Sequence, residues 1–389
     1  MPETKLQRVA VLGATGSIGR SAAAELSTFT DRFQVTILAA RNNLTELAAQ
    51  SEIFHPRQTI TTDPSKLAEL AALLPDGVKA AAGANAMLEA AIADDVDIVL
   101  CAVLGTAGIK PVLEALKRGK KVALASKEVL ALAGELVMAE AKKHPDAGIV
   151  PIDSEHSGVF QCLQGRRPDE IAKVWLTASG GAFRDWSAEK MATATFADAL
   201  KHPTWKMGAK ITIDSASMMN KALELIEAHF LFDLPPEKLD AVINPQSVIH
   251  ALAELTDGSF IAQMSIPDMR LAIRYALTYP ERLPGAVGKI NLPDLAHLDL
   301  IAADEKKYPA LALGKAAVAA GGTMPAVLNA ANEVAVEKFR CGKISFPDIW
   351  HLVADVMESV PLEKQESLEQ ILDCDARARR CAEKWQSRK

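Results

Sequence analysis

Cysteine is scarce in this chain of 389 residues, and its placement shows no pattern. The five cysteines are an odd number, and no two of them stand in a C-x-x-C pair. Disulfide frameworks and zinc sites need paired or closely spaced cysteines, so this distribution argues against both. It is typical of reduced thiols in a cytosol, and we expect a cytoplasmic protein.

The chain also lacks long apolar runs and any excess of positive charge. No uninterrupted apolar run reaches the ~18 residues that a membrane span needs. The N-terminal MPETKLQR leads directly into an expected strand, with no sign of a secretory leader. The net charge of -6 argues against a nucleic-acid or anionic-membrane partner. Any anionic ligand must therefore be held by a local pocket.

What the chain does contain is an alternation of strands and helices over residues 8 to 150. Apolar runs such as RVAVLG, FQVTILAA, VDIVLCAVLG and KKVALAS are separated by helical patterns such as GRSAAAELSTF and LTELAAQSEIF. This alternation predicts an α/β fold that opens with a doubly wound, mostly parallel Rossmann-type domain over residues 1–150. The length of 389 residues predicts one or two further domains.

The second part of the chain has a different pattern. The runs KVWLTASGG, KITID, AVINPQSVIHALAEL and GSFIAQMSI predict a partly antiparallel sheet in a central α+β domain, residues 151–278. Within this domain, residues 181–210 form a long connection of poor periodicity, which is typical of a functional lid. Residues 279–307 are rich in proline and suit a linker. Residues 308–389 have the periodicity of a C-terminal helical domain.

A glycine-rich turn follows the first expected strand. Its sequence LGATGSIG spaces Gly13, Gly16 and Gly19 as G-x-x-G-x-x-G, with Thr15 and Ser17 between them. Small residues at the start of a helix let the backbone approach a pyrophosphate, so the turn predicts a dinucleotide site. The alternative is a tight strand-to-helix turn that binds no nucleotide.

The end of the second expected strand bears on the choice of nucleotide. Sites for NAD usually place Asp or Glu there for the ribose 2′-hydroxyl, whereas this chain has AARNN. Arg41, beside Asn42 and Asn43, suits a 2′-phosphate instead, which favours NADP(H). The alternative is that Arg41 is an ordinary surface arginine.

Two further stretches carry side chains that suit a cation and an anion. In PIDSEHS, Asp153 and Glu155 would share one side of an extended segment. In ITIDSASMMNKALELIEA, we expect a strand that ends at Asp214-Ser215 and then an amphipathic helix, on which Asn220, Lys221 and Glu224 share a face. Carboxylates beside a hydroxyl- and lysine-containing helix start indicate a hard divalent cation next to a phosphorylated substrate. The alternative is a solvated helix face and a common loop pair.

Several motifs together resemble the 1-deoxy-D-xylulose-5-phosphate reductoisomerase family. They are GATGSIG, ASKE, DSEHS, TASGG, HPTW-K-MG, TIDSASMMNKALELIEA, PQSVIH and NAANEVAV, in the family's order and over nearly the whole chain. The resemblance implies an enzyme that uses NADPH and Mg²⁺ or Mn²⁺, with Co²⁺ as a further option, to make 2-C-methyl-D-erythritol 4-phosphate for isoprenoid synthesis. It also implies a homodimer that acts on a small phosphorylated sugar and, without a transit peptide, a bacterial member.

The resemblance assigns roles to residues at matching positions. The implied metal ligands are Asp153, Glu155 and Glu224, which with Lys127 form the catalytic group. The implied phosphate-binding group is Ser179, Ser215, Asn220 and Lys221. Ser154 and Lys127, like Glu155 and Glu224, would contact the substrate. His202 would help to bind it and Trp205 would cover it, as parts of the lid. The implied cofactor contacts are Thr15, Gly16, Ser17, Ile18, Ala40, Arg41, Asn42, Ser126, Glu128, Met207 and Gly208.

Two positions depart from the family's pattern. Ser126 stands where the family usually has Asn, and Ala40 where it frequently has Gly, so both departures concern cofactor contacts. Two other interpretations remain open from the residues alone. An NADP-dependent dehydrogenase of the homoserine or semialdehyde type would share the first domain without needing the carboxylates. A non-catalytic NADP-binding regulatory protein would keep only the glycine turn. Metal dependence distinguishes all three.

Overall fold

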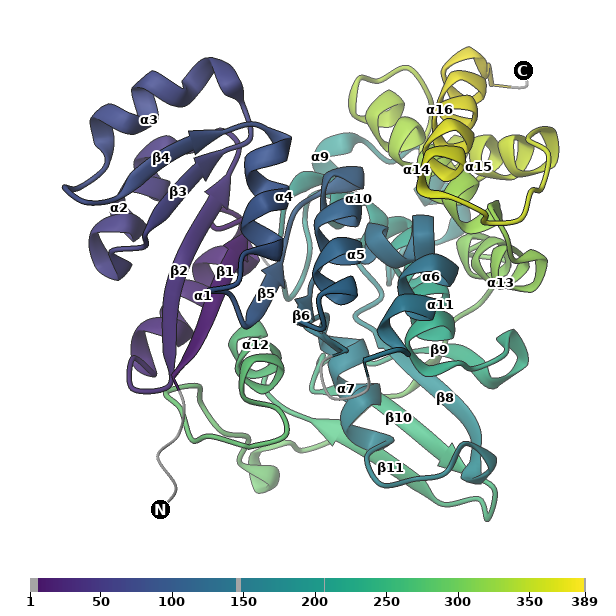
Figure 1. Cartoon of the computed structure of the whole chain (residues 1–389). Coiled ribbons are helices and arrows are strands. Elements are labelled where there is room, and N and C mark those ends of the chain that lie inside the picture. The colour runs from purple at the N-terminus through teal and green to yellow at the C-terminus, as the bar shows by residue number, and fades with distance from the viewer. Residues whose placement is uncertain (1–5, 145–147, 206, 388–389) are drawn as a thin grey trace. The chain divides into compact units, whose positions relative to one another are not determined.

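A computed structural model of the chain describes residues 6–144, 148–205 and 207–387. Residues 1–5, 145–147, 206 and 388–389 lie outside the described residues, and so do the parts of the predicted segments that include them. The chain forms two compact units, and neither is one continuous stretch (Figure 1). Unit 1 comprises residues 1–129, 137–157 and 268–287, and unit 2 comprises residues 130–136, 158–267 and 288–389.

Unit 1 is built on a parallel sheet of seven strands. The order is β4-β3-β2-β1-β5-β6-β7, and every neighbouring pair is parallel. The strands are β1 (Gln7–Leu12), β2 (Phe33–Ala40), β3 (Gln58–Thr61), β4 (Lys79–Ala82), β5 (Ile98–Cys101), β6 (Lys121–Leu124) and β7 (Ile149–Pro151). The strand order reverses at β1, between β2 and β5, which creates the crevice where doubly wound sheets bind nucleotides. The predicted Rossmann-type architecture is confirmed.

Helices connect these strands in the expected alternation. They are α1 (Ser17–Thr28), α2 (Leu44–Phe54), α3 (Leu67–Leu73), α4 (Ala84–Ile92), α5 (Ile109–Lys117) and α6 (Lys127–Ala141). The strand predicted as VDIVLCAVLG ends already at Cys101, and a 3-10 turn over Gly105–Gly108 precedes α5. All of β5 is buried, because helices cover both faces of a parallel sheet.

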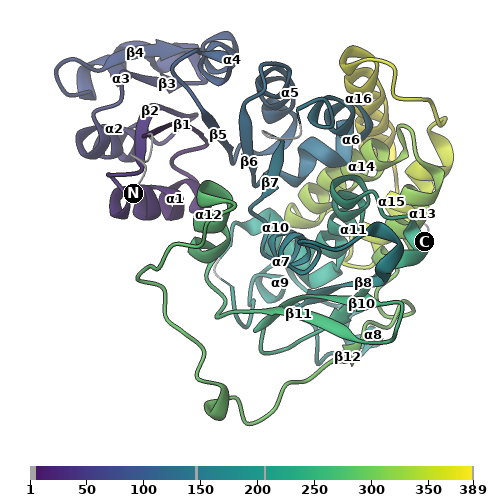
Figure 2. The same cartoon turned by 60° about the horizontal axis from the view of Figure 1, so that its bottom comes forward.

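A helix from much later in the chain completes unit 1. Helix α12 (Met269–Thr278) packs against α1, as Figure 2 shows, and also contacts β6 and β7. The guanidinium of Arg274 on α12 forks onto the carboxylate of Glu25 on α1, with N–O distances of 2.7 and 3.2 Å. Lys121 on β6 donates to the carbonyls of Leu277 and Tyr279 at the end of α12, and burial lowers the pKa of its ammonium to about 8.

Unit 2 contains a smaller mixed sheet of five strands. Their order is β11-β10-β8-β9-β12, with β8 and β9 parallel and the other pairs antiparallel. The strands are β8 (Ile171–Ala178), β9 (Leu239–Ile243), β10 (Ile249–Leu255), β11 (Phe260–Met264) and β12 (Ile301–Ala302). The partly antiparallel central sheet is therefore confirmed. Strand β12 lies inside the segment predicted as a linker, which thus contributes to the sheet edge.

The remaining helices of unit 2 lie around this sheet and at the C-terminus. They are α7 (Ser154–Cys162, whose first turn belongs to unit 1), α8 (Ala188–Ala192), α9 (Phe196–Ala199), α10 (Ala209–Ser217), α11 (Met219–Phe232), α13 (Ala310–Ala320), α14 (Met324–Arg340), α15 (Asp348–Ser359) and α16 (Leu368–Lys384). The last four form the predicted C-terminal helical domain, coloured green to yellow in Figure 1. A Cβ on Gly314 of α13 would lie 2.8 Å from Cα of Ala222, so glycine lets α13 approach α11 closely.

Two local predictions are wrong. The segment KITID is not a strand but the middle of helix α10, in which residues 212 to 217 are all buried. The segment around Asp153 and Glu155 is not extended, because α7 begins at Ser154. For KITID the reason is that burial on every side of α10 removes the difference between a two-residue and a 3.6-residue period. Within the described residues, no helix is long and apolar enough to cross a membrane.

Candidate active site

The glycine turn joins β1 to α1 in a conformation that requires glycine at two positions. Gly13 has a positive φ of 93°, and a Cβ on it would lie 2.3 Å from the carbonyl oxygen of Ala102. A Cβ on Gly19 would lie 2.3 Å from the carbonyl oxygen of Ala14. Gly16 caps the N-terminus of α1 and is exposed together with Ser17. The turn therefore presents small residues and the N-terminus of a helix at the edge where the strand order reverses.

The end of β2 carries no acidic side chain. Ala40 is buried, and Arg41 and Asn42 after it are exposed at the carboxyl edge of the sheet. The carbonyl oxygen of Arg41 accepts a hydrogen bond from Oγ1 of Thr61 at 3.0 Å, which fixes the backbone here. The acid that would select a free 2′-hydroxyl is therefore missing at this position, and a cation stands in its place.

The carboxyl ends of β6 and β7 bring together a lysine and an aspartate. Lys127 begins α6 after β6, and Asp153 follows β7, the parallel neighbour of β6. Their charged groups meet at 2.6 Å, with side chains 10% and 15% exposed. Ser126 directs its hydroxyl to the carbonyl oxygen of Val103 at 2.6 Å and so ties the loops after β5 and β6 together. Glu128 in the first turn of α6 is buried.

Asp153 and Glu155 both lie at the N-terminus of α7. The carbonyl oxygen of Asp153 accepts from the amide of Ser157, the first bond of the helix. The Ser154 hydroxyl donates to the Glu155 carboxylate. One oxygen of Asp153 and one of Glu155 lie within 4.8 Å of each other, a spacing that a single cation can bridge. Carboxylate oxygens are the ligands that Mg²⁺ and Mn²⁺ prefer.

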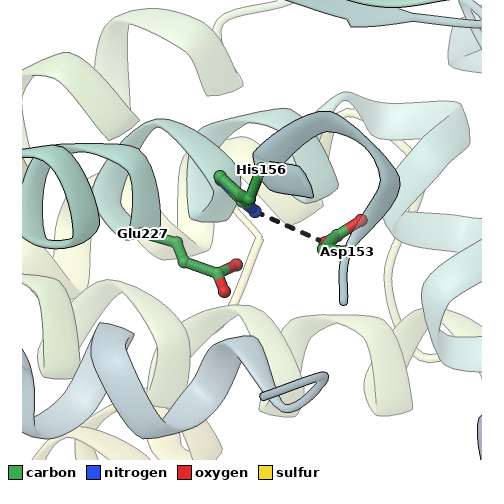
Figure 3. A group of neighbouring side chains, drawn as sticks. All are labelled: Asp153, His156 and Glu227. Carbon is green, nitrogen blue, oxygen red and sulfur yellow. Dashed lines mark ion pairs between the residues drawn. The ribbon is translucent and has the colours of Figure 1, made fainter. Parts of the chain in front are cut away.

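A buried histidine backs this carboxylate pair, and its role was not anticipated from the sequence. His156 is fully buried, and its Nδ1 lies 3.9 Å from Oδ2 of Asp153, as the dashed line in Figure 3 marks. Figure 3 also draws Glu227 of α11, a buried acid one turn beyond Glu224. Neither residue gives a signal in the sequence, because a lone buried histidine or acid has no characteristic spacing.

In unit 2, three predicted substrate ligands form a cluster around an imidazole. Nε2 of His202 lies 3.0 Å from Oγ of Ser179 and 3.1 Å from Oγ of Ser215. The turn after β8 approaches α10 so closely that a Cβ on Gly181 would lie 2.5 Å from the carbonyl oxygen of Ser215. Gly181 has a φ of 65°, so both its conformation and its contact require glycine. The tight turn thus sets the distance between the two hydroxyls.

The hydrogen bonds on the other ring nitrogen define the protonation state of His202. Its Nδ1 accepts from the backbone amides of Thr204 and Trp205, at 3.1 and 2.8 Å. An acceptor nitrogen carries no proton, so the neutral ring has its proton on Nε2, between the two serines. Burial, with a smaller contribution from Arg184, lowers the pKa of His202. The cluster therefore offers three hydrogen-bond donors, two hydroxyls and one N–H, to an anion.

A second cluster on α11 surrounds a fully buried carboxylate. Lys221 donates to Glu224 and to the carbonyl oxygen of Thr177, and Asn220 donates to the other oxygen of Glu224. Lys221 and Glu224 are 2% and 0% exposed. The expected shared face of α11 is thus confirmed, but it is buried and not solvated. Lys221 contacts the carbonyl oxygen of Thr177, which lies two residues before Ser179 in the chain. Its ammonium can therefore interact both with the buried Glu224 carboxylate and with a bound anion.

Comparison with known proteins identifies the family. A family model of 1-deoxy-D-xylulose 5-phosphate reductoisomerase matches residues 9–134, and two models of the reductoisomerase C-terminal domain match residues 149–232 and 264–381. The reductoisomerases of Chloroherpeton thalassium and Pelotomaculum thermopropionicum are 44% and 46% identical over 376 residues, which is 96% of this chain and 97% of each relative. This chain belongs to the 1-deoxy-D-xylulose 5-phosphate reductoisomerase family.

Solved reductoisomerase structures share the fold over the whole length. The enzyme from Zymomonas mobilis in complex with NADPH is 41% identical, with a TM-score of 0.92. The match covers 97% of this chain and 98% of the Zymomonas mobilis chain. A reductoisomerase in complex with NADPH, fosmidomycin and magnesium is 40% identical, again with a TM-score of 0.92 and the same coverage. The family membership removes the two other interpretations of the sequence, a semialdehyde-type dehydrogenase and a regulatory protein.

The segment expected to form the reductoisomerase lid is only partly without a fold. Its first half is anchored in unit 2, because Phe183 is fully buried and its ring packs edge-on against that of Phe346, with 4.8 Å between centroids. Helices α8 and α9 follow. Trp205 and Met207 are half-buried and Gly208, which caps α10, is exposed. Between residues 181 and 210, the described residues without helix or strand are 181–187, 193–195, 200–205 and 207–208.

The C-terminal helices support α10 by contacts that the sequence analysis did not assign. Nδ2 of Asn332, in the NAANEVAV motif, donates to Oδ1 of Asp214 at 2.9 Å, and both side chains are buried. Lys210 reaches the other oxygen of Asp214 at 2.8 Å. Nε1 of Trp350 donates to the carbonyl oxygen of Ser217 at 3.0 Å. Asp214 and Ser217 flank Ser215, so this reductoisomerase uses its C-terminal helices to fix a predicted phosphate ligand.

Proposed function

We propose that this chain catalyses the NADPH- and divalent-metal-dependent conversion of 1-deoxy-D-xylulose 5-phosphate to 2-C-methyl-D-erythritol 4-phosphate, a step of the non-mevalonate route to isoprenoid precursors. The observation that carries the proposal lies within unit 1. The glycine turn for a dinucleotide and the pair Asp153 and Glu155 stand at the same carboxyl edge of one sheet. The dinucleotide would supply the hydride for the reduction, and a hard cation beside it would assist the rearrangement that precedes the reduction. The activity of the family requires both steps.

For the metal, we propose as ligands the three carboxylates that the resemblance implies, Asp153, Glu155 and Glu224. The fit rests on the donor set, because all three offer carboxylate oxygens, which are hard ligands that suit Mg²⁺ or Mn²⁺. Bound there, the cation would supply Lewis-acid polarisation of substrate oxygens. His156 behind Asp153 and the amide of Asn220 on Glu224 orient the carboxylates.

We assign Lys127 to the oxygen on which charge develops. Its side chain is only 10% exposed and its ammonium pairs with Asp153, so it is a donor held beside a proposed metal ligand. Ser154, whose hydroxyl now bonds Glu155, can contact a substrate hydroxyl from the same helix end. Neither residue needs to lose a proton for these roles.

We assign the phosphate to the donors of unit 2, namely Ser179, Ser215, His202, Asn220 and Lys221. The two serine hydroxyls already converge on Nε2 of His202, at 3.0 Å for Ser179 and 3.1 Å for Ser215. Binding at the phosphate, distant from the reacting carbons, orients those carbons and supplies energy for the chemical step. Closure of the stretch around Trp205, Met207 and Gly208 would then exclude water from the aldehyde intermediate.

Two further expectations remain proposals. We propose a homodimer, which the resemblance implies. Strand β11 at the edge of the unit 2 sheet supports it, because Phe260 on this strand is 52% exposed. We propose a cytoplasmic location, as reduced cysteines and an NADPH-dependent reaction favour one.

The test follows NADPH absorbance after addition of 1-deoxy-D-xylulose 5-phosphate, with and without chelator. We expect turnover only when the metal is present. Asp153→Asn, Glu155→Gln and Glu224→Gln should each abolish turnover and leave NADPH binding, followed by nucleotide fluorescence, near normal. Asp169→Asn, which neutralises an exposed acid in unit 2, is the matched control and should keep full activity. Undiminished turnover after exhaustive chelation would show that the proposal is wrong.

A further inference from the structure

The loop after β3 is fastened to the end of β2 at the carboxyl edge of the unit 1 sheet. β2 and β3 are parallel, and Ala40 stands opposite Thr61 at their ends. The amide of Thr62 donates to the carbonyl oxygen of Ala40 at 2.8 Å, and Oγ1 of Thr61 donates to that of Arg41 at 3.0 Å. Residues 62–66 are thus held beside Arg41 and Asn42.

This loop carries a lysine that the sequence analysis did not consider. Lys66 ends the 3-10 turn Pro64–Lys66, which Asp63 caps through Ser65. Nζ of Lys66 lies 3.4 Å from the carbonyl oxygen of Asn42 and 3.3 Å from its Oδ1. The side chain of Lys66 therefore extends from the loop after β3 to Asn42, the residue that follows Arg41, and both oxygens that it contacts are uncharged.

The charges at this edge are not balanced. In the described part of the chain, neither Arg41 nor Lys66 forms an ion pair; Arg41 is exposed and Lys66 is half-buried. Asp63, which begins the same turn, is an acid close to both cations in the chain fold; hydrogen bonds from Ser65 lower its pKa, with smaller contributions from the charges of Lys66 and Arg41. Two cations facing one engaged carboxylate leave an excess of positive charge where the second strand of a dinucleotide-binding sheet ends.

The ribose of the adenosine half of a dinucleotide is recognised at this point of a doubly wound sheet. We propose that Lys66 binds the 2′-phosphate of NADPH together with Arg41, and that it is a determinant of the preference for NADPH over NADH. This inference rests on the proposed function for the identity of the cofactor. An arginine supplies a planar fork and a lysine a movable point charge, so the two can hold different oxygens of one phosphate. A phosphate dianion would also supply the negative charge that the edge lacks.

The test measures binding of four probes to the full chain, NADPH, NADH, 2′,5′-ADP and 5′-AMP, by calorimetry and nucleotide fluorescence. Lys66→Gln removes the charge and keeps most of the side chain. We expect it to weaken NADPH and 2′,5′-ADP by about tenfold, as the loss of one charge-assisted bond to phosphate implies. NADH and 5′-AMP should change by less than about twofold, and Lys66→Arg should restore most of the affinity for NADPH.

The control is Lys79→Gln, which removes an exposed lysine from the opposite, amino edge of the same sheet, at the start of β4. It should leave all four affinities unchanged. In turnover, Lys66→Gln should raise KM for NADPH and leave kcat near that of the wild type. Raised salt should weaken NADPH less in Lys66→Gln than in the wild type, because one phosphate contact is gone.

Equal weakening of NADPH and NADH by Lys66→Gln would overturn the inference, since Lys66 would then only brace the Asn42 backbone. Unchanged NADPH affinity would overturn it as well. Failure of the proposed function has a different appearance. The wild-type chain would then bind NADPH and 2′,5′-ADP no better than NADH and 5′-AMP, before any variant is compared.

Discussion

The buried pair of Glu25 and Arg274 offers a demanding test of how unit 1 is assembled. Replacing Arg274 with methionine removes the guanidinium and leaves the Glu25 carboxylate enclosed between α1 and α12. The two side chains are only 6% and 7% exposed, and both nitrogens of the fork are used. Solvent therefore cannot replace the lost partner without separating the helices.

The magnitude follows from that burial. Removing one partner of a buried ion pair costs about 3–5 kcal/mol, whereas exposed pairs contribute about 0–1 kcal/mol. For a folding unit of this size, each kcal/mol shifts the unfolding midpoint by roughly 2–4 °C. We therefore expect Arg274→Met to lower the midpoint of unit 1 by roughly 6–20 °C. Arg32→Met, which breaks the exposed pair with Glu281, should lower it by less than about 4 °C.

The assay is thermal unfolding followed by calorimetry, with hydrogen exchange of peptides from α1 and α12 to show where stability is lost. The double variant Glu25→Leu with Arg274→Met replaces the pair by apolar side chains and should recover most of the loss. A midpoint for Arg274→Met within about 2 °C of the wild type would refute the reasoning. So would a double variant no more stable than the single one, because the cost would then lie in packing and not in an unpaired charge.

Three further predictions concern unit 2. Gly181→Ala places a Cβ 2.5 Å from the carbonyl oxygen of Ser215 at a positive φ, and should raise KM for the substrate by at least about tenfold in steady-state assays while NADPH binding is unchanged. The pKa of His202 is lower in the folded protein than in the unfolded chain, so the unfolded chain binds a proton at a higher pH than the folded protein does. The free energy of unfolding of the wild type should therefore fall relative to that of His202→Gln as the pH drops below 6.5. Denaturant titrations at several pH values will measure this. Trp350→Phe removes the donor to the Ser217 carbonyl and should cost about 1–3 kcal/mol in unfolding free energy; an unchanged denaturation midpoint would contradict this contact.

The sequence predicts the first half of unit 1 well, for a physical reason. The run FQVTILAA becomes β2 with the same ends, because β-branched and apolar residues bounded by polar ones have few other solutions. The strands β3 and β4 received no prediction, since they are only four residues long and Lys79–Ala82 contains no residue that favours a strand. The helix α12 could not be assigned to unit 1, because its partner is 249 residues away in the chain.

The residue types of the candidate site could be read from the sequence, but their conformation could not. The resemblance implies that Asp153 and Lys221 are ligands, and these roles stay predictions. The wrong strand at KITID shows the limit, because Ile211 and Ile213 alternate with polar residues as a strand would. Asp214, a polar position of this run, can be buried because Asn332 donates to its carboxylate from a distant helix and Lys210 pairs with it. Such long-range satisfaction of a buried polar group leaves no local pattern in the sequence.

The late arrival of α12 has a consequence for the order in which the protein is made. Residues 158–267, which belong to unit 2, leave the ribosome between β7 and the segment 268–287. At about 5–20 residues per second, these 110 residues take roughly 5–20 s to synthesise. During that interval the nascent N-terminal sheet exists without the helix that covers α1, and the Glu25 carboxylate lacks its ion pair with Arg274. We therefore expect a ribosome-bound chain stopped before residue 268 to be cleaved by protease within α1. A chain stopped well after residue 287 should be protected there.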